Sequence, residues 1–200
     1  MPDLTVGTNT IEAHIPYYLT REQKEGLTKA LNDFHERPIE YYASQHENEM
    51  LQGDGWIGLQ VLHFNDGVRK NIKGIILSNS CDISTENKRE LPTNITFAPI
   101  IKLDNYAAIL KQAGLKDVQI EGKLESIKNQ NVTNIFYLPS GGTLDSDYIA
   151  LLSDLHSIPS QAFGQIAERE KIFTLSMVGF YLFVLKLSVH FCRFHENVTR

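Results

Sequence analysis

The sequence predicts an α+β domain in which a small antiparallel β-structure lies between helical segments. Three short runs rich in β-forming residues occur in the middle of the chain, at 56–64, 72–77 and 94–103. Turn-forming residues separate these runs, and apolar residues spaced three and four apart flank them on both sides. Short strands with turn-rich links are typical of a small barrel or sandwich, whereas the flanking spacing is typical of helices.

Helices are expected ahead of the β-structure. Thr20-Arg21-Glu22-Gln23 has the form of a capping box, in which side chains satisfy the free backbone donors at a helix start. A second, shorter helix carrying Tyr42 and His46 is expected to run towards Met50. The sequence thus predicts a helical N-terminal segment over 20–50.

Further elements are expected after the third strand. Apolar spacing predicts three helices, at 106–112, 118–127 and 174–197. The run 135–139 is expected to return to the sheet as a late strand, while Pro99 should restrict the third strand to an edge or a bulge. We therefore expect a single domain over 1–200 with a barrel core at about 51–139.

Composition narrows the range of functions. The chain has 200 residues, 42% of them hydrophobic and 22% charged, which is ordinary for a globular protein. This length suffices to bury a core without a structural metal or a disulfide. No cofactor is expected. The net charge of −5 disfavours a protein that coats nucleic acid as its main role, although it leaves room for a local basic groove.

The sequence also bears on the compartment. Cys81 and Cys192 lie more than a hundred residues apart, which favours a reducing environment over a disulfide-linked secreted scaffold. The first residues carry neither a basic region nor an apolar run of the kind found in signal peptides. The charge-free run 172–185 is shorter than the ~20 residues that span a bilayer. A cytoplasmic protein without a membrane segment is expected.

Three motifs occur in order over about 51–103. The first is Gly53-Asp54-Gly55-Trp56, the second is the strand end Gly74-Ile75-Ile76-Leu77-Ser78-Asn79, and the third is Ile95-Thr96-Phe97-Ala98-Pro99-Ile100. Their order and spacing resemble the MazF/PemK family of toxin-like SH3 barrels. The resemblance implies an SH3-like barrel, an RNA-cleaving activity, and RNA, an antitoxin-type protein or a second copy of the chain as partner.

The chain departs from this family at two catalytic positions. Lys73 stands where the family pattern has an Arg, although Arg69 is close by, and Ile101 stands where the pattern has a Thr. Without those donors a phosphate transition state is less stabilised. We therefore predict an RNA- or protein-binding module without efficient cleavage. The alternative is a divergent endoribonuclease whose chemistry rests on Arg69, Lys73 and Asp82.

The segment that follows the second strand carries further candidates. Asn79, Cys81 and Asp82 could form a binding site at the rim of a concave surface, with Lys102 close to Asp82. A metal-dependent enzyme centred on Cys81 and Asp82 is another hypothesis, but the negative charge of the adjacent carboxylate argues against an activated cysteine. A simpler interpretation is that Asn79 and Asp82 cap a turn while Cys81 fills an apolar pocket.

The C-terminal helix adds a polar stripe. Lys186, His190, Arg193 and Asn197 recur at intervals of four, three and four. Such a stripe could bind a phosphate or a carboxylate, or it could be the solvent face of a packed helix. We expect the opposite side of the helix to pack inward through its large apolar residues, Phe180, Phe183, Leu187 and Phe191.

Two other groups of side chains are weaker candidates. His190, Cys192, His195 and Glu196 could hold a metal only with help from Cys81 or His156, because histidines five residues apart diverge on a helix. No metal site is therefore predicted. Asp154, His156 and Ser157 contain the groups of a catalytic triad, but residues so close in sequence seldom converge in space.

Overall fold

The computed structural model describes residues 40–46, 49–63, 65–84, 86–87 and 90–191. The chain divides into two compact units, Met1–Glu40 and Tyr41–Arg200, and the strands and helices that the structure describes all belong to the second. The helix predicted to start at Thr20 lies outside the described residues.

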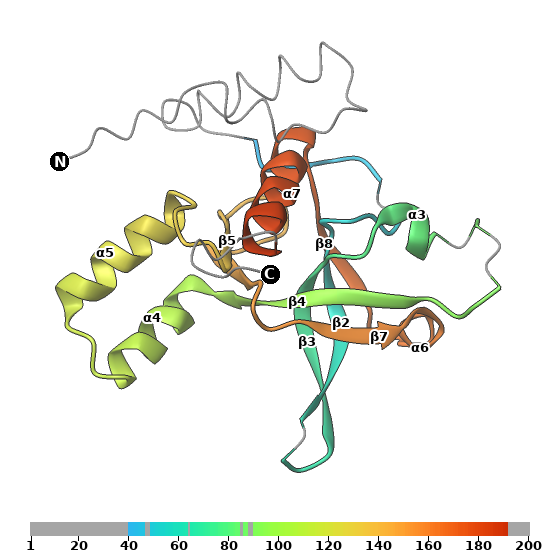
Figure 1. Ribbon diagram of the computed structural model, residues 1–200, viewed down its shortest axis with the longest axis horizontal. Helices are drawn as coiled ribbons and strands as arrows, with labels where there is room; N and C mark the ends of the chain where they lie inside the picture. The colour runs from blue at the N-terminus through green and yellow to red at the C-terminus, as the bar shows by residue number, and fades with distance from the viewer. Residues whose placement is uncertain (1–39, 47–48, 64, 85, 88–89, 192–200) are drawn as a thin grey trace, which may run out of the picture. The chain divides into compact units, whose positions relative to one another are not determined.

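An antiparallel sheet of eight strands forms the centre of this unit (Figure 1). The strands are β1 (Tyr42–Ala43), β2 (Gly55–His63), β3 (Val68–Ile76), β4 (Asn94–Lys102), β5 (Ile135–Leu138), β6 (Tyr148–Leu151), β7 (His156–Pro159) and β8 (Glu170–Leu175). Their order is β1-β8-β2-β3-β4-β6-β5, and β7 pairs with β4. The α+β class is confirmed, with the three predicted strands adjacent in the sheet. Pairing leaves the sheet open between β1 and β5.

Five helices are described: α3 (Ser80–Ile83), α4 (Leu103–Gln112), α5 (Asp117–Lys128), α6 (Ser160–Gly164) and α7 (Met177–Phe191). The predicted helices at 106–112 and 118–127 correspond to α4 and α5, and the late strand at 135–139 corresponds to β5. Gly114 lies just beyond α4 at a φ of +87°, a conformation that glycine adopts without strain and that ends the helix.

Pro99 was expected to restrict the third strand to an edge or a bulge, but this strand, β4, has neighbours on both sides. It pairs with β3 on one side, while on the other side 94–97 pair with β7 and 100–102 pair with β6. Pro99 falls between these two pairings, at the point where the neighbour of β4 changes. A missing backbone donor is tolerated there because the ladder is already interrupted.

Two clusters of buried residues pack against the sheet. One cluster of buried residues joins β2, β3, β4 and β7 to α3 and α6: Leu59, Ile76, Ile83, Ile95, Phe97, Ile158 and Phe163. A second joins β5 and β6 to α4 and α5: Leu103, Ile127, Ile135 and Ile149. The predicted burial of Phe97 is confirmed at 0% exposure, whereas Trp56 is only partly buried and meets Phe163 edge to face.

The described part of the segment predicted as a short helix towards Met50 contains no helix. Tyr42 and Ala43 form β1, which pairs with Leu175 and Thr174 of β8. The Tyr42 ring also packs on Phe173 at 5.2 Å between ring centroids. These contacts lie more than a hundred residues away, so tertiary packing overrode a local helical spacing.

The C-terminal helix starts later than predicted. Residues 170–175 form strand β8, and α7 begins at Met177 after Ser176, whose hydroxyl accepts a hydrogen bond from the Gly179 amide at 3.1 Å. A short apolar run such as Ile172–Leu175 fits a buried strand as well as a helix, and here it is held between β1 and β2.

Helix α7 packs through fewer aromatic residues than expected. Phe183 is fully buried and lies 5.1 Å from the Phe136 ring of β5, but Phe180 is half-buried and Phe191 is 53% exposed. Within the described part of the chain, no helix combines the length and apolar character needed to cross a membrane.

Candidate nucleic-acid interface

The β2–β3 hairpin extends beyond the rest of the sheet (Figure 1). Among the described strands, β2 alone pairs with β3 from 68 to 72, because pairing with β4 begins only at Gly74. Side chains alternate along a strand, so Arg69, Asn71 and Lys73 share one face of the hairpin while Lys70 lies on the other. Gln60 joins the first group and donates its amide to Asn71 at 3.2 Å.

Two neighbouring strands continue this polar face. The register of β3 with β4 puts Lys102 on the same side as Lys73, and Lys102 pairs directly with Tyr148 of β6. The Lys73 amine lies 3.3 Å from the Tyr148 hydroxyl and 5.3 Å from the ring centroid. The Lys102 amine lies 5.9 Å from the same centroid. Two cations therefore meet one tyrosine that is only 3% exposed.

Asp145 completes what we call the lysine–tyrosine cluster, made of Lys73, Lys102, Asp145 and Tyr148. Lys102 contacts Asp145 at 2.6 Å, and Tyr148 donates to the other carboxylate oxygen at 3.2 Å. The hydrogen bond from Lys102 lowers the pKa of Asp145 to about 2, and the same bond raises the pKa of Lys102.

The cluster carries an excess of positive charge. Within the described residues Lys73 contacts a hydroxyl and a ring but no carboxylate, whereas Lys102 has Asp145 as a partner. An ammonium group beside a phenol hydroxyl can donate to the oxygens of a phosphate. This arrangement is suited to binding an anion.

The Ser78–Asp82 segment lies elsewhere on the molecule. Asn79 is the N-cap of α3, and its side chain accepts a hydrogen bond from the Cys81 amide at 2.9 Å, which confirms the predicted capping role. Cys81 and Asp82 are both exposed, so the apolar pocket expected for Cys81 is not found. The cap bond accounts for the placement of Asn79 in this segment.

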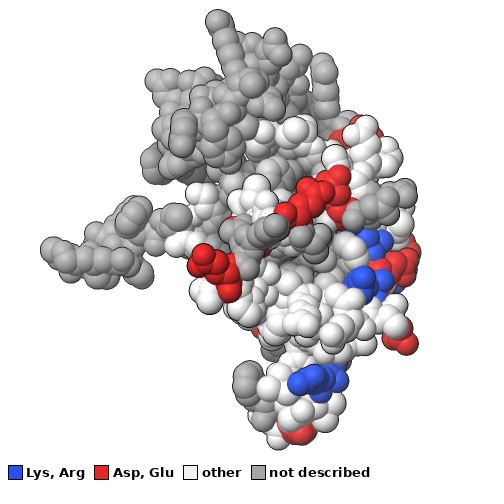
Figure 2. Space-filling model, turned by 90° about the vertical axis from the view of Figure 1, so that its right-hand side faces the viewer, with Lys and Arg blue, Asp and Glu red and all other residues white. Residues whose placement is uncertain are grey.

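Asp82 and Lys102 do not come together as predicted. The Ser78 hydroxyl accepts a hydrogen bond from the Thr96 amide at 2.8 Å, so the segment that leads to α3 lies beside Thr96. Lys102 lies six residues beyond Thr96 along β4, which separates Lys102 from Thr96 by ~20 Å. Figure 2 shows the side of the molecule that carries α3 and α6, where acidic side chains interrupt the basic ones and most of the visible surface is uncharged. The described residues on that side form no continuous basic surface.

The prediction that Lys186 lies on a polar stripe at the surface is wrong. Lys186 is only 7% exposed, and its amine donates to the carbonyl oxygen of Gln130, two residues beyond the end of α5. Burial lowers the pKa of this amine to about 8. His190 is half-buried, and Arg193 lies outside the described residues. The buried Lys186 amine thus has a backbone carbonyl as its hydrogen-bond partner, as buried polar groups usually do.

A buried ion pair was missed by the sequence analysis. Asp54, which is fully buried, contacts the Lys171 amine at 2.7 Å, and Lys171 also donates to the His46 carbonyl and the Thr174 hydroxyl. Burial raises the pKa of Asp54, and the hydrogen bond from Lys171 opposes that rise. The Oδ1 atom of Asp54 has no hydrogen-bond partner among the described residues. The sequence signal for this ion pair was Asp54 itself, a charged residue between two glycines at the start of β2.

Asp154, His156 and Ser157 do not form a catalytic triad. His156 contacts Asp154 at 3.1 Å and stacks on Phe97, whereas the adjacent Ser157 is exposed. No group of three potential metal ligands occurs within the described ranges. Cys192, His195 and Glu196 lie outside these ranges. The chain matches no protein-family model and no curated protein at a significant level, so its own geometry must support a function.

Proposed function

We propose that this chain binds single-stranded RNA through the lysine–tyrosine cluster and the adjacent hairpin face, without efficient cleavage. The observation that carries this proposal is the Lys73 amine, which contacts the Tyr148 hydroxyl and has no carboxylate partner among the described residues. Arg69 and Asn71 extend the polar face along the same strand. Phosphate contacts to lysines and arginines supply most of the affinity in sequence-independent binding of nucleic acid.

The SH3-like barrel belongs to the same proposal. The three motifs that resemble the toxin-like family fall at the start of β2, the end of β3 and along β4. These strands are antiparallel neighbours in the sheet, which supports a barrel-like arrangement.

Binding without cleavage is favoured over the endoribonuclease alternative. Cleavage by Arg69, Lys73 and Asp82 would require the three side chains to converge on one phosphate. Arg69 and Lys73 lie four residues apart on β3, and Asp82 lies on α3 beyond the opposite end of that strand. Arg69 and Lys73 share a face of β3 and can contribute to phosphate binding. Asp82 is not on that face, so the carboxylate that the cleavage hypothesis needs is missing there.

The test is RNA binding measured by fluorescence anisotropy at several salt concentrations, with a labelled 12-nucleotide single-stranded RNA. We expect Lys73→Ala and Lys102→Ala each to weaken binding and to reduce the slope of log K against log salt by about 0.7 for each phosphate that the variant no longer neutralises. The RNA should remain intact when it is examined on a denaturing gel after incubation.

Lys70→Ala is the matched control, since Lys70 lies on the same strand but on the opposite face of the hairpin. This variant should keep the affinity and the salt slope of the wild type. Equal losses in all three variants, or no binding by the wild type, would contradict the proposal. Binding of an acidic peptide at Lys73 in place of RNA would instead indicate an antitoxin-type protein partner.

A further inference from the structure

A cavity of about 330 Å³ lies between residues 43–46 and 51–52 on one side and the start of α7 on the other. Its apolar lining comes mainly from Leu51, Leu175, Met177 and Phe180, and its polar lining from Gln45, His46, Gln52, Ser80, Thr174 and Ser176. A cavity of this size, apolar with a few fixed polar groups, is typical of a small-molecule site. No residue of β4 or β6 lines it, so it is separate from the lysine–tyrosine cluster.

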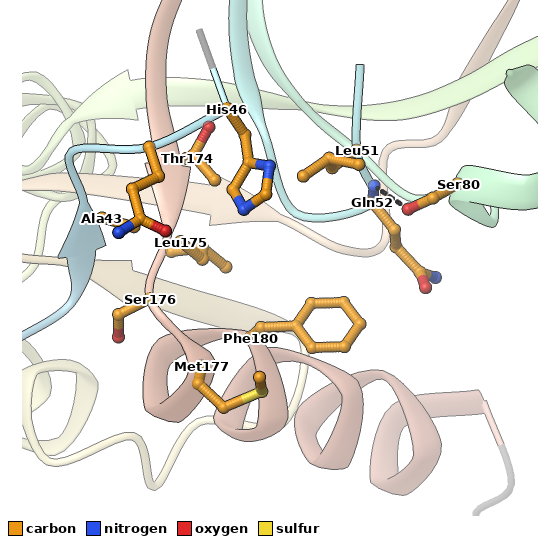
Figure 3. Close-up of a pocket in the computed structure, with 11 residues that line it drawn as sticks. Ala43, His46, Leu51, Gln52, Ser80, Thr174, Leu175, Ser176, Met177 and Phe180 are labelled. Atoms are coloured by element: carbon orange, nitrogen blue, oxygen red, sulfur yellow. Dashed lines mark hydrogen bonds between the residues drawn. The ribbon is translucent and has the colours of Figure 1, made fainter. Parts of the chain in front are cut away.

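Two rings face the cavity from opposite sides. Figure 3 shows the His46 imidazole extending into the space from one wall and the Phe180 ring from the other, with Leu175 and Gln52 at the flanks. Rings on two sides leave a space suited to a flat molecule, because aromatic groups stack on planar heterocycles.

The backbone of the His46 wall is held in an uncommon conformation. His46 has a φ of +69°, and its carbonyl accepts a hydrogen bond from the buried Lys171 amine at 2.7 Å. Lys171 is in turn paired with Asp54, whose carboxylate also accepts from the Leu51 amide at 2.8 Å. The ion pair therefore fixes two residues of the cavity wall, and a preformed wall favours binding.

Gln52 and Ser80 can offer a ligand one hydrogen-bond acceptor and one hydrogen-bond donor. The Gln52 side-chain amide donates to the Leu77 carbonyl at 2.7 Å, which orients it, and its Oε1 atom has no partner among the described residues. The Ser80 hydroxyl accepts from the Gln52 backbone amide at 2.9 Å and can still donate its own proton. Together they complement a ligand edge that carries one donor next to one acceptor.

We propose that this cavity binds a single nucleobase, as part of a nucleoside or nucleotide. A nucleobase is planar and presents adjacent donors and acceptors on its edge. Among the described residues that line the cavity there is no lysine, arginine, aspartate or glutamate, so the base rather than a charged group should supply the recognition. This inference does not rest on RNA binding at Lys73.

The test uses uridine, which has no phosphate, and protein labelled with ¹³C at the methionine methyl groups. We expect uridine at millimolar concentration to shift the Met177 methyl resonance in a saturable way, because Met177 lines the cavity. The Met50 resonance should stay in place, since Met50 packs against the core and does not line the cavity. Uridine methylated at N3 has no edge donor and should bind at least about fivefold more weakly.

Phe180→Leu should weaken uridine binding by at least about fivefold, because it removes the stacking ring while apolar volume is kept. Phe191→Leu on the same helix is the control, since Phe191 is exposed and does not line the cavity. Lys73→Ala should leave uridine binding unchanged. An unshifted Met177 resonance in the wild type, or equal affinity for uridine and its N3-methyl form, would overturn the proposal even if Phe180→Leu failed to fold.

Discussion

Two lysine–aspartate pairs in this protein have nearly the same length but very different surroundings. Lys171 and Asp54 are 2.7 Å apart with side-chain exposures of 11% and 0%, whereas Lys102 and Asp145 are 2.6 Å apart with exposures of 40% and 65%. Water screens the second pair and is nearly excluded from the first. Distance alone therefore does not tell which pair matters for stability.

The two pairs also shift carboxylate pKa values in opposite directions. Burial raises the pKa of Asp54, because the charged form has lost its hydration. The hydrogen bond from Lys102 lowers the pKa of exposed Asp145 to about 2, because little hydration is lost there. The buried pair is thus a structural contact that tolerates no missing partner, and the exposed pair is free to exchange partners with a ligand.

The largest expected effect is at the buried pair. Lys171→Met leaves the Asp54 carboxylate buried without its cation and should lower the free energy of unfolding by about 3–5 kcal/mol. Urea unfolding followed by circular dichroism measures this. The double variant Asp54→Asn/Lys171→Met removes both charges and should recover much of the loss. A single variant as stable as the wild type would show that the pair is not buried in solution.

An intermediate effect is expected at Lys186, which is buried without a carboxylate partner among the described residues. Its pKa falls from 10.5 to about 8, a shift that corresponds to about 3 kcal/mol. Between pH 8 and pH 10 the unfolded chain keeps a proton that the folded chain has lost. Stability should therefore rise with pH in this window.

Lys186→Met should abolish that rise and increase stability at pH 7 by up to about 3 kcal/mol, less the loss of its bond to the Gln130 carbonyl. Urea unfolding of both proteins at several values between pH 7 and pH 10 measures the difference. Parallel pH profiles for the two proteins would argue against a lowered pKa at Lys186.

The smallest effect on stability is expected at the exposed pair. Lys102→Ala should leave the melting temperature almost unchanged, because water and salt screen the contact with Asp145. The same variant should weaken RNA binding, since Lys102 belongs to the lysine–tyrosine cluster. Thermal unfolding and anisotropy on one preparation separate the two roles. A large fall in melting temperature would place Lys102 among the structural contacts.

The sequence by itself determined the local elements whose signals are strong. Turn residues and β-forming runs located β2, β3 and β4, and apolar spacing with Gly114 located α4. Asn79 was correctly placed as a cap because an N-cap bond spans only two residues. These features depend on neighbours along the chain, which a sequence displays directly.

Only the tertiary structure decided the placement of the charges and of the short apolar runs. Tyr42 joined a strand because Leu175 lay opposite, and Asp145 rather than Asp82 became the partner of Lys102. Lys186 appeared to continue a polar stripe, yet its amine is buried against Gln130. Each outcome depends on a partner more than forty residues away, and a partner at that distance is fixed by packing rather than by local pattern.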